Sequence, residues 1–292
     1  MYFFLFVFGL AIGSFLNVVS MRFKPKQEIF DFKSLNLLCG GRSRCPHCHK
    51  ILKWYELAPI FSFLFQKGKC LSCGHKLSFQ YLIVEILTGL IFVFVPLSLV
   101  KFFPYILYSK FYILIAILWL LIFTLFLLLS IIDFRHYIIP DLINLSLAIL
   151  GIILIFFESQ DYSIFNSFIG HYALLFGSFG NIWVDHFFAA FISMALYGII
   201  IILSRGKGMG WGDFKLIAAI GLIFGWPDTL IIALLAFIIG SLFVIPLLIR
   251  GKKKMKDAVP FGPFIIIAAA VVFFFGFQMT DAYFKFFNLF VK

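Results

Sequence analysis

Two pairs of cysteines in the first third of the chain have the spacing of a zinc site. The pairs are Cys45-Pro46-His47-Cys48 and Cys70-Leu71-Ser72-Cys73, and the second starts 22 residues after Cys48. Four thiolates fit the tetrahedron that Zn²⁺ prefers, at a spacing close to that of zinc ribbons. We therefore expect Cys45, Cys48, Cys70 and Cys73 to hold a structural zinc that organises a module too small to fold alone. The remaining candidates, Cys39, His47, His49 and His75, are expected to lie outside the ligand set.

Three aspartates, Asp133, Asp141 and Asp213, stand at the ends of apolar runs. Ionisable residues in such places are costly and mark function more often than elsewhere. Asp133 closes one run and Asp213 opens another, so a helix bundle can bring these two carboxylates together. Two carboxylates about 3 Å apart share one proton. The ionised one can take a proton from water while the protonated one polarises a peptide carbonyl, which is aspartyl-protease chemistry without a metal.

Glycines occupy alternate positions before the second acid, at Gly208, Gly210 and Gly212. A backbone without side chains can adopt positive φ and lets an extended substrate chain approach closely. Taken alone, the segment is equally typical of a flexible turn with Asp213 as the helix N-cap, and Asp141 of an ordinary helix start. The acids Asp185, Asp228 and Asp281 are expected at solvated boundaries.

The composition places these residues in a membrane. The 292 residues are 63% hydrophobic and 13% charged, with a mean hydropathy of +1.08, whereas a soluble domain is about half apolar and a quarter charged. Secreted mini-domains, disordered chains and nucleic-acid binders are excluded. Apolar runs near 20 residues long predict an all-α polytopic membrane protein of about eight transmembrane helices, with a small cytoplasmic zinc module between the first two.

The expected helices divide the chain into three parts: a first transmembrane helix in residues 1–21, a cytoplasmic cysteine loop in 22–80 and a transmembrane protease core in 81–292. The sixth span, 213–225, is short enough to be a half-helix. The expected spans are 2–21, 81–100, 111–132, 142–157, 187–203, 213–225, 229–249 and 260–279. Segment 158–186 shows no chemistry and is expected to form a surface loop.

Charge sets the expected orientation. Of the 24 lysines and arginines, 20 lie in loops on one side of the alternating spans and 4 on the other. Because basic residues concentrate on cytoplasmic loops, the N-terminus is expected outside and the paired acids at the cytoplasmic face. The polar Gly13-Ser14 and Asn17 within the first span predict close helix packing with an interhelical hydrogen bond.

Together these segments resemble the prepilin peptidases, or type IV leader peptidases, of the G-x-G-D class of membrane aspartyl proteases. The matching residues run along nearly the whole chain: Gly13-Ser14-Phe15-Leu16-Asn17-Val18, Arg22, the two cysteine pairs, Trp54-Tyr55-Glu56-Leu57, Pro59, Gly68-Lys69-Cys70, Glu85, Asp133, Ile139-Pro140-Asp141, Gly210-Trp211-Gly212-Asp213-Phe214-Lys215-Leu216 and Pro260-Phe261-Gly262-Pro263-Phe264.

The resemblance implies that Asp133 and Asp213 are the catalytic pair, supported by Gly210, Gly212, Asp141 and Lys215. It implies a location in the inner membrane and a substrate that is a prepilin or pseudopilin of a type IV pilus or type II secretion system. The enzyme would cut a short basic leader after a glycine at the cytoplasmic membrane face. Many members then methylate the new N-terminus with S-adenosylmethionine.

Three alternatives stay open. The enzyme can be a peptidase alone, because Gln80-Tyr81-Leu82 stands where the family usually has Arg-Tyr-Pro. A zinc-regulated transporter would need acids near the bilayer midplane, whereas these acids lie at helix ends. A non-catalytic assembly factor of the pilus or secretion machinery is disfavoured by the intact pair of aspartates.

Overall fold

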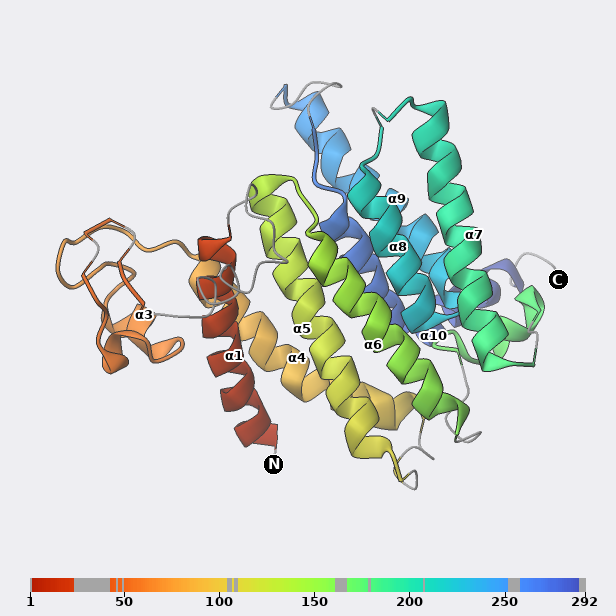
Figure 1. The fold of residues 1–292 in the computed structure, drawn as a ribbon, viewed down its shortest axis with the longest axis horizontal. Coiled ribbons are helices and arrows are strands. Elements are labelled where there is room, and N and C mark those ends of the chain that lie inside the picture. Colours follow the sequence, from red (N-terminus) through yellow and green to blue (C-terminus); the bar gives the residue numbers. More distant parts are fainter. Residues whose placement is uncertain are drawn as a thin grey trace. The chain divides into compact units, whose positions relative to one another are not determined.

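The protein is helical over the part of the chain that the computed structural model describes (Figure 1). That part comprises residues 2–23, 43–45, 47–48, 50–103, 107, 110–160, 167–177, 180–206, 208–251 and 258–288. Its only extended pairing is two isolated antiparallel bridges in the cysteine module. Cys39 and His49 lie outside the described residues. The predicted all-α class is confirmed.

Eight long helices account for most of the described residues. They are α1 (Tyr2–Arg22), α4 (Gln80–Phe102), α5 (Tyr112–His136), α6 (Asp141–Ser159), α7 (Ile182–Leu203), α8 (Trp211–Phe224), α9 (Asp228–Ile249) and α10 (Gly262–Asn288). Seven of them are long and apolar enough to cross a membrane. The exception is α8, whose 14 residues rise about 21 Å. The sixth expected span is therefore the short helix that its sequence predicted.

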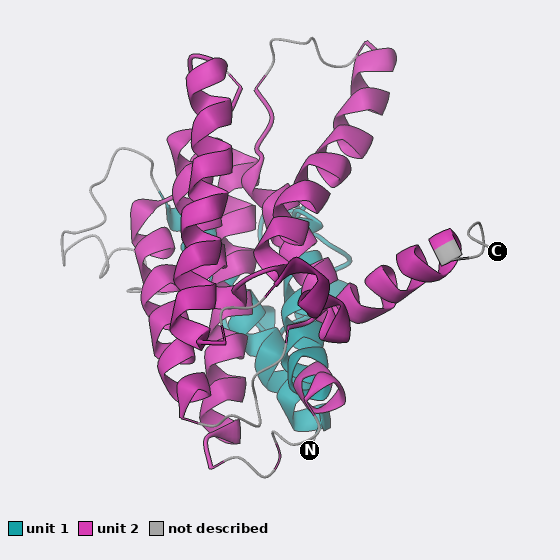
Figure 2. Ribbon diagram, turned by 90° about the vertical axis from the view of Figure 1, so that its right-hand side faces the viewer, with its two compact units in different colours: residues 1–97 teal, residues 98–292 magenta. Residues whose placement is uncertain are grey.

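The described chain forms two compact units, residues 1–97 and 98–292 (Figure 2). The first unit holds α1, most of α4 and the cysteine module. The second holds the other six long helices. The expected division into 1–21, 22–80 and 81–292 stays a prediction about function.

In the first unit, α1 packs closely on α4. A Cβ atom added to Gly13 would lie 2.8 Å from the Glu85 Cα atom, so only glycine allows this approach. The Asn17 side-chain amide donates a hydrogen bond to the Tyr81 carbonyl at 3.1 Å. The close packing and interhelical hydrogen bond that the sequence predicted are confirmed.

In the second unit, α8 is surrounded by other helices. It contacts α6, α7, α9 and α10, and its apolar residues are buried around its circumference, as expected for a central helix. Gly221 permits the closest crossing, because a Cβ atom there would lie 2.4 Å from the Ala190 Cα atom of α7. Figure 1 shows that α5 ends and α8 begins at the same end of this bundle.

Part of segment 158–186 is buried, although a surface loop was expected. Phe168 and Ile169 are 6% and 0% exposed, and the Phe168 ring packs against Trp119 and Phe224 at centroid distances of 5.5 and 5.7 Å. A short 3₁₀ helix, η3 (Gly170–Phe176), follows. The segment turns inward because the large apolar side chains of Phe168 and Ile169 are buried among other apolar residues.

The expectation that Asp185 and Asp228 are solvated is also wrong, since they are 3% and 0% exposed. The Asp228 carboxylate accepts hydrogen bonds from the Ser167 hydroxyl at 2.6 Å and the Phe168 N–H at 2.9 Å. The acid therefore holds the inward-turning segment in place. Asp281 is more open and accepts from Tyr172 and Lys285.

Candidate active site

Asp133 is placed by the end of α5. The helix stops at Tyr137, which has a left-handed φ of 57° and whose N–H bonds to the Asp133 carbonyl. The Asp133 side chain is 4% exposed, and its Oδ2 atom accepts the Gly262 N–H at 3.1 Å. The first residue of α10 thus fixes the orientation of this carboxylate.

Asp213 is placed by the start of α8. Gly210 is the N-cap, and the Asp213 Oδ2 atom reaches back to accept the Gly210 N–H at 3.2 Å. The alternative in which Asp213 itself is the N-cap is wrong, because it occupies the third position of the helix. Its other oxygen, Oδ1, is buried and has no hydrogen-bond partner among the described residues.

The structure brings the two acids together. The Asp213 carboxylate lies within range of the Asp133 charge. A third residue links their surroundings: added Cβ atoms at Gly212 and Gly262 would lie 2.9 Å from Ile139 Cβ and 3.1 Å from Ile139 Cδ1. The backbone beside each acid therefore borders Ile139 at one end of the second unit, and a proton shared by the two carboxylates stays a prediction.

The glycines before Asp213 do not take the left-handed backbone that was expected, while their role in admitting a substrate chain stays a prediction. None of Gly208, Gly210 and Gly212 has a positive φ. Gly210 has an ordinary φ of −82°, and Gly212 must be small because Ile139 packs against it. The expectation of left-handed backbone was wrong because the turn before α8 takes its positive φ earlier, at Arg205 and Gly206.

Asp141 and Lys215 form an ion pair at the rim of this site. The Lys215 ammonium group lies 2.8 Å from Asp141 Oδ1, and the two side chains are 49% and 64% exposed. Asp141 is the first residue of α6. The pair links the start of α6 to the N-terminal part of α8.

Sequence reasoning did not single out two buried polar residues near Asp213. The Asn144 amide donates to the Gly212 carbonyl at 3.4 Å, and Tyr197 lies within range of the Asp213 charge. Both are almost fully buried, at 4% and 0% exposed. In the sequence, each is a polar residue within an otherwise apolar span. That pattern is also typical of helix packing, so it does not identify a functional residue.

The four cysteines of the first unit converge. Their Sγ atoms all lie within 4.8 Å of one another, and Cys45 and Cys73 are 3.9 Å apart. Zn–S bonds of about 2.3 Å place tetrahedral sulfurs about 3.8 Å apart, so the cluster fits zinc. The N–H groups of Cys73 and Ser72 lower the pKa of the Cys70 thiol to about 6, which favours the thiolate that a metal requires.

Two histidines beside this cluster contact each other. The His47 and His75 rings stack at a centroid distance of 4.5 Å. In the same unit, Glu56 accepts the Lys53 N–H and Glu85 accepts the Ile60 N–H, both at 2.7 Å. These two buried acids therefore stabilise the backbone of the module.

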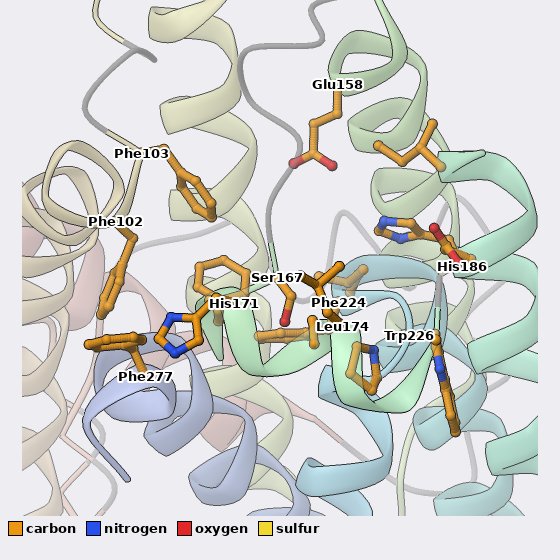
Figure 3. Close-up of a pocket in the computed structure, with 18 of the residues that line it drawn as sticks. Phe102, Phe103, Glu158, Ser167, His171, Leu174, His186, Phe224, Trp226 and Phe277 are labelled. Carbon is orange, nitrogen blue, oxygen red and sulfur yellow. The ribbon is translucent and has the colours of Figure 1, made fainter. Parts of the chain in front are cut away.

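A cavity of about 540 Å³ lies at the opposite end of the second unit, where α8 finishes (Figure 3). Several aromatic rings line it together with polar and small residues, and the Glu158 carboxylate points toward it. Neither Asp133 nor Asp213 lines this cavity. It is therefore separate from the paired carboxylates.

Comparison with known proteins gives a consistent result. Residues 7–99 match the bacterial peptidase A24 N-terminal domain, and residues 119–245 match the type IV leader peptidase family. No solved structure matches the chain at a comparable level.

Relatives extend this similarity over nearly the full length. A prepilin leader peptidase/N-methyltransferase of Dichelobacter nodosus is 31% identical, with 96% of this chain and 94% of the relative aligned. The proteins of the same name from Aeromonas hydrophila and Bacillus subtilis (strain 168) are 29% and 28% identical, with 95% and 96% of this chain and 92% and 97% of the relatives aligned. The chain therefore belongs to the type IV leader peptidase family.

Proposed function

We propose that the protein is a membrane-embedded aspartyl endopeptidase that removes the leader of type IV prepilins or pseudopilins. The observation that supports this proposal is that Asp213 lies within range of the Asp133 charge. One oxygen of Asp213, Oδ1, has no hydrogen-bond partner among the described residues. The names of the full-length relatives support the substrate class.

The reaction needs one proton shared by the two carboxylates. The carboxylate pair takes a proton from a water molecule as the water oxygen bonds to the peptide carbonyl carbon. At the same time the proton that the pair already held passes to the carbonyl oxygen. Collapse of the tetrahedral intermediate breaks the C–N bond as the leaving amine receives a proton from the pair. Because the groups titrate together, the shared proton belongs to the pair.

The orientation of the enzyme follows from its charge. The excess of basic residues in one set of loops favours the face bearing Asp133 and Asp213 as the cytoplasmic one, with the N-terminus outside. Placing the site at a helix end, level with a membrane surface, suits a substrate cut next to its apolar helix. The same placement disfavours a transporter, which would hold its acids near the midplane.

The zinc module and a second activity complete the proposal. A structural Zn²⁺ would be bound by the four thiolates of Cys45, Cys48, Cys70 and Cys73, with no open ligand position. The ion would crosslink the two cysteine pairs and so stabilise residues 43–76. Methylation of the new N-terminus would use S-adenosylmethionine. Glu56 and Glu85 each accept a backbone N–H through one carboxylate oxygen, so these two acids hold the module together.

The test is co-expression with a prepilin, scored by the mass of the pilin product. Asp133→Asn and Asp213→Asn should each abolish leader removal while the protein still accumulates in the membrane. Asp281→Asn is the matched control, because it removes an acid outside the pair and should leave cleavage intact. Leader removal by both paired variants would refute the mechanism. The same mass spectra would show whether the mature N-terminus carries a methyl group.

A further inference from the structure

Buried polar atoms without partners gather at one place in the described part of the protein. They are Asn144 Oδ1, Tyr197 OH and Asp213 Oδ1. Each side chain is at least nine-tenths buried. Because an unpaired buried polar atom lowers stability, most such atoms in proteins are paired, and each exception needs an explanation. Asn144 bonds to the residue before Asp213, and Tyr197 lies within range of the Asp213 charge. Three exceptions in one region are what a small polar guest would satisfy.

Tyr197 is held in place by its ring. On α7, Ser193, Tyr197 and Ile201 follow one another at intervals of four residues and face the interior. The Tyr197 ring packs 5.5 Å from Phe237 and 6.3 Å from Phe261. Phe261 directly precedes Gly262, whose N–H holds Asp133, so the ring lies beside the anchor of one acid. Tyr197 also lies within range of the charge of the other acid, Asp213.

Asn144 lies on α6, which also contacts α8. Its amide nitrogen donates to the Gly212 carbonyl at 3.4 Å, one residue before Asp213. This bond fixes the amide orientation and leaves Oδ1 as a free acceptor. The unpaired set around Asp213 thus consists of two acceptors, Asn144 Oδ1 and Asp213 Oδ1, and one hydroxyl that can donate, on Tyr197.

A single water molecule matches this set. Water has two O–H donors and two lone pairs. It can donate to Asp213 Oδ1 and to Asn144 Oδ1 and accept from the Tyr197 hydroxyl. One lone pair then remains for the peptide carbonyl carbon.

We propose that Tyr197 and Asn144 are positioning residues that hold the hydrolytic water against Asp213. This role rests on the proposed peptidase function. The bond formed is between the water oxygen and the carbonyl carbon, and one water proton passes to the carboxylate pair while the proton of the pair passes to the carbonyl oxygen. The two positioning residues keep their own protons throughout.

The first test is Tyr197→Phe, which removes the hydroxyl and keeps the ring. The purified enzyme would be assayed on a fluorogenic peptide that contains a basic leader, the glycine and the first apolar residues of a pilin. The expected result is a fall in kcat of about 10- to 100-fold with KM nearly unchanged, the size of a lost hydrogen bond to a charged centre. Tm should change little, because the ring keeps its packing against Phe237 and Phe261.

Ser193→Ala is the matched control, since it removes a hydroxyl from the same face of α7. The Ser193 hydroxyl bonds to the Ala190 carbonyl at 3.0 Å, so this variant should lower Tm and leave kcat unchanged. A lower Tm with unchanged kcat for Tyr197→Phe as well would show that Tyr197 is structural and would overturn the proposal.

A double variant tests whether the two residues hold one water. Asn144→Leu should lower kcat, and adding Tyr197→Phe should cause little further loss, because either change alone displaces the same molecule. Losses that multiply would refute a shared water. Asp213→Asn is run alongside: if it still cleaves, the proposed function and this role both fail, whereas wild-type kcat for Tyr197→Phe beside an inactive Asp213→Asn refutes only the role of Tyr197.

Discussion

The Gly262 N–H donates a hydrogen bond to Asp133 Oδ2 at 3.1 Å, joining residues 129 positions apart in the chain. The contact makes the start of α10 part of the site. It also requires glycine, because a Cβ atom at residue 262 would lie 2.8 Å from the same oxygen. The position of the catalytic candidate on α5 thus depends on the absence of a side chain on α10.

Gly262→Ala should therefore lower peptidase activity without unfolding the protein. The methyl group must displace the Asp133 carboxylate, and a misplacement of about 1 Å in a catalytic group can reduce turnover about 100-fold. Steady-state cleavage of a leader peptide measures the effect. Gly198→Ala is the control, because a Cβ atom there would meet the Phe214 ring at an ordinary 3.4 Å. Equal activity of the two variants would contradict this account.

Asp141→Asn should leave cleavage within about twofold of the wild type. The Lys215 and Asp141 side chains are 49% and 64% exposed, and exposed ion pairs contribute at most about 1 kcal/mol. Lys215→Met should behave in the same way. A loss of tenfold or more in both variants, measured as kcat/KM, would show that the pair contacts the substrate rather than only bracing α6 and α8.

The purified protein should contain about one Zn²⁺ per chain by elemental analysis. Cys45→Ser should release it, since Cys45 is 2% exposed and its sulfur lies 3.9 Å from that of Cys73. Loss of the ion should also make residues 43–76 sensitive to protease, because the module has little apolar core of its own. Cys39→Ser, which removes the cysteine outside the two pairs, should keep the metal. Wild-type protein without zinc would refute the assignment.

Asp228→Ala should lower stability and spare the chemistry. The substitution leaves the Ser167 hydroxyl and the Phe168 N–H without their acceptor, at a cost of about 1–3 kcal/mol for each unpaired buried donor. Thermal unfolding should shift to lower temperature, while kcat per folded molecule stays unchanged. Ser167→Ala should cause a smaller shift, as it removes one of the two bonds. Inactivity of fully folded Asp228→Ala would link this end of the bundle to catalysis.

Much of the fold was predictable because hydropathy reports membrane crossing directly. The eight apolar runs correspond to the eight long helices, and the short run after Asp213 became the short α8. The cysteine spacing predicted a cluster that the structure forms, because metal-ligand geometry leaves few arrangements for two C-x-x-C pairs. The approach of Asp133 to Asp213 followed from their positions at matching helix ends.

Burial by distant parts of the chain could not be predicted. Asp228 resembles a solvated helix start, and its burial depends on Phe168, about 60 residues earlier, turning into the core. Gly212 gives no local sign that Ile139 presses against it. Tyr197 and Asn144 have the appearance of ordinary polar residues in a span, since only the assembled bundle leaves their polar atoms unpaired.

The shortness of α8 has a consequence for the lipid around the enzyme. A hydrocarbon layer is about 30 Å thick, so a 14-residue helix alone would force the bilayer to thin. Here the missing length is supplied by protein, because Phe168 packs on the last residue of α8, Phe224, and the Trp226 indole N–H bonds to the Phe176 carbonyl. Protein rather than lipid therefore covers the end of α8. The helix that begins with the Asp213 turn can end early without deforming the membrane.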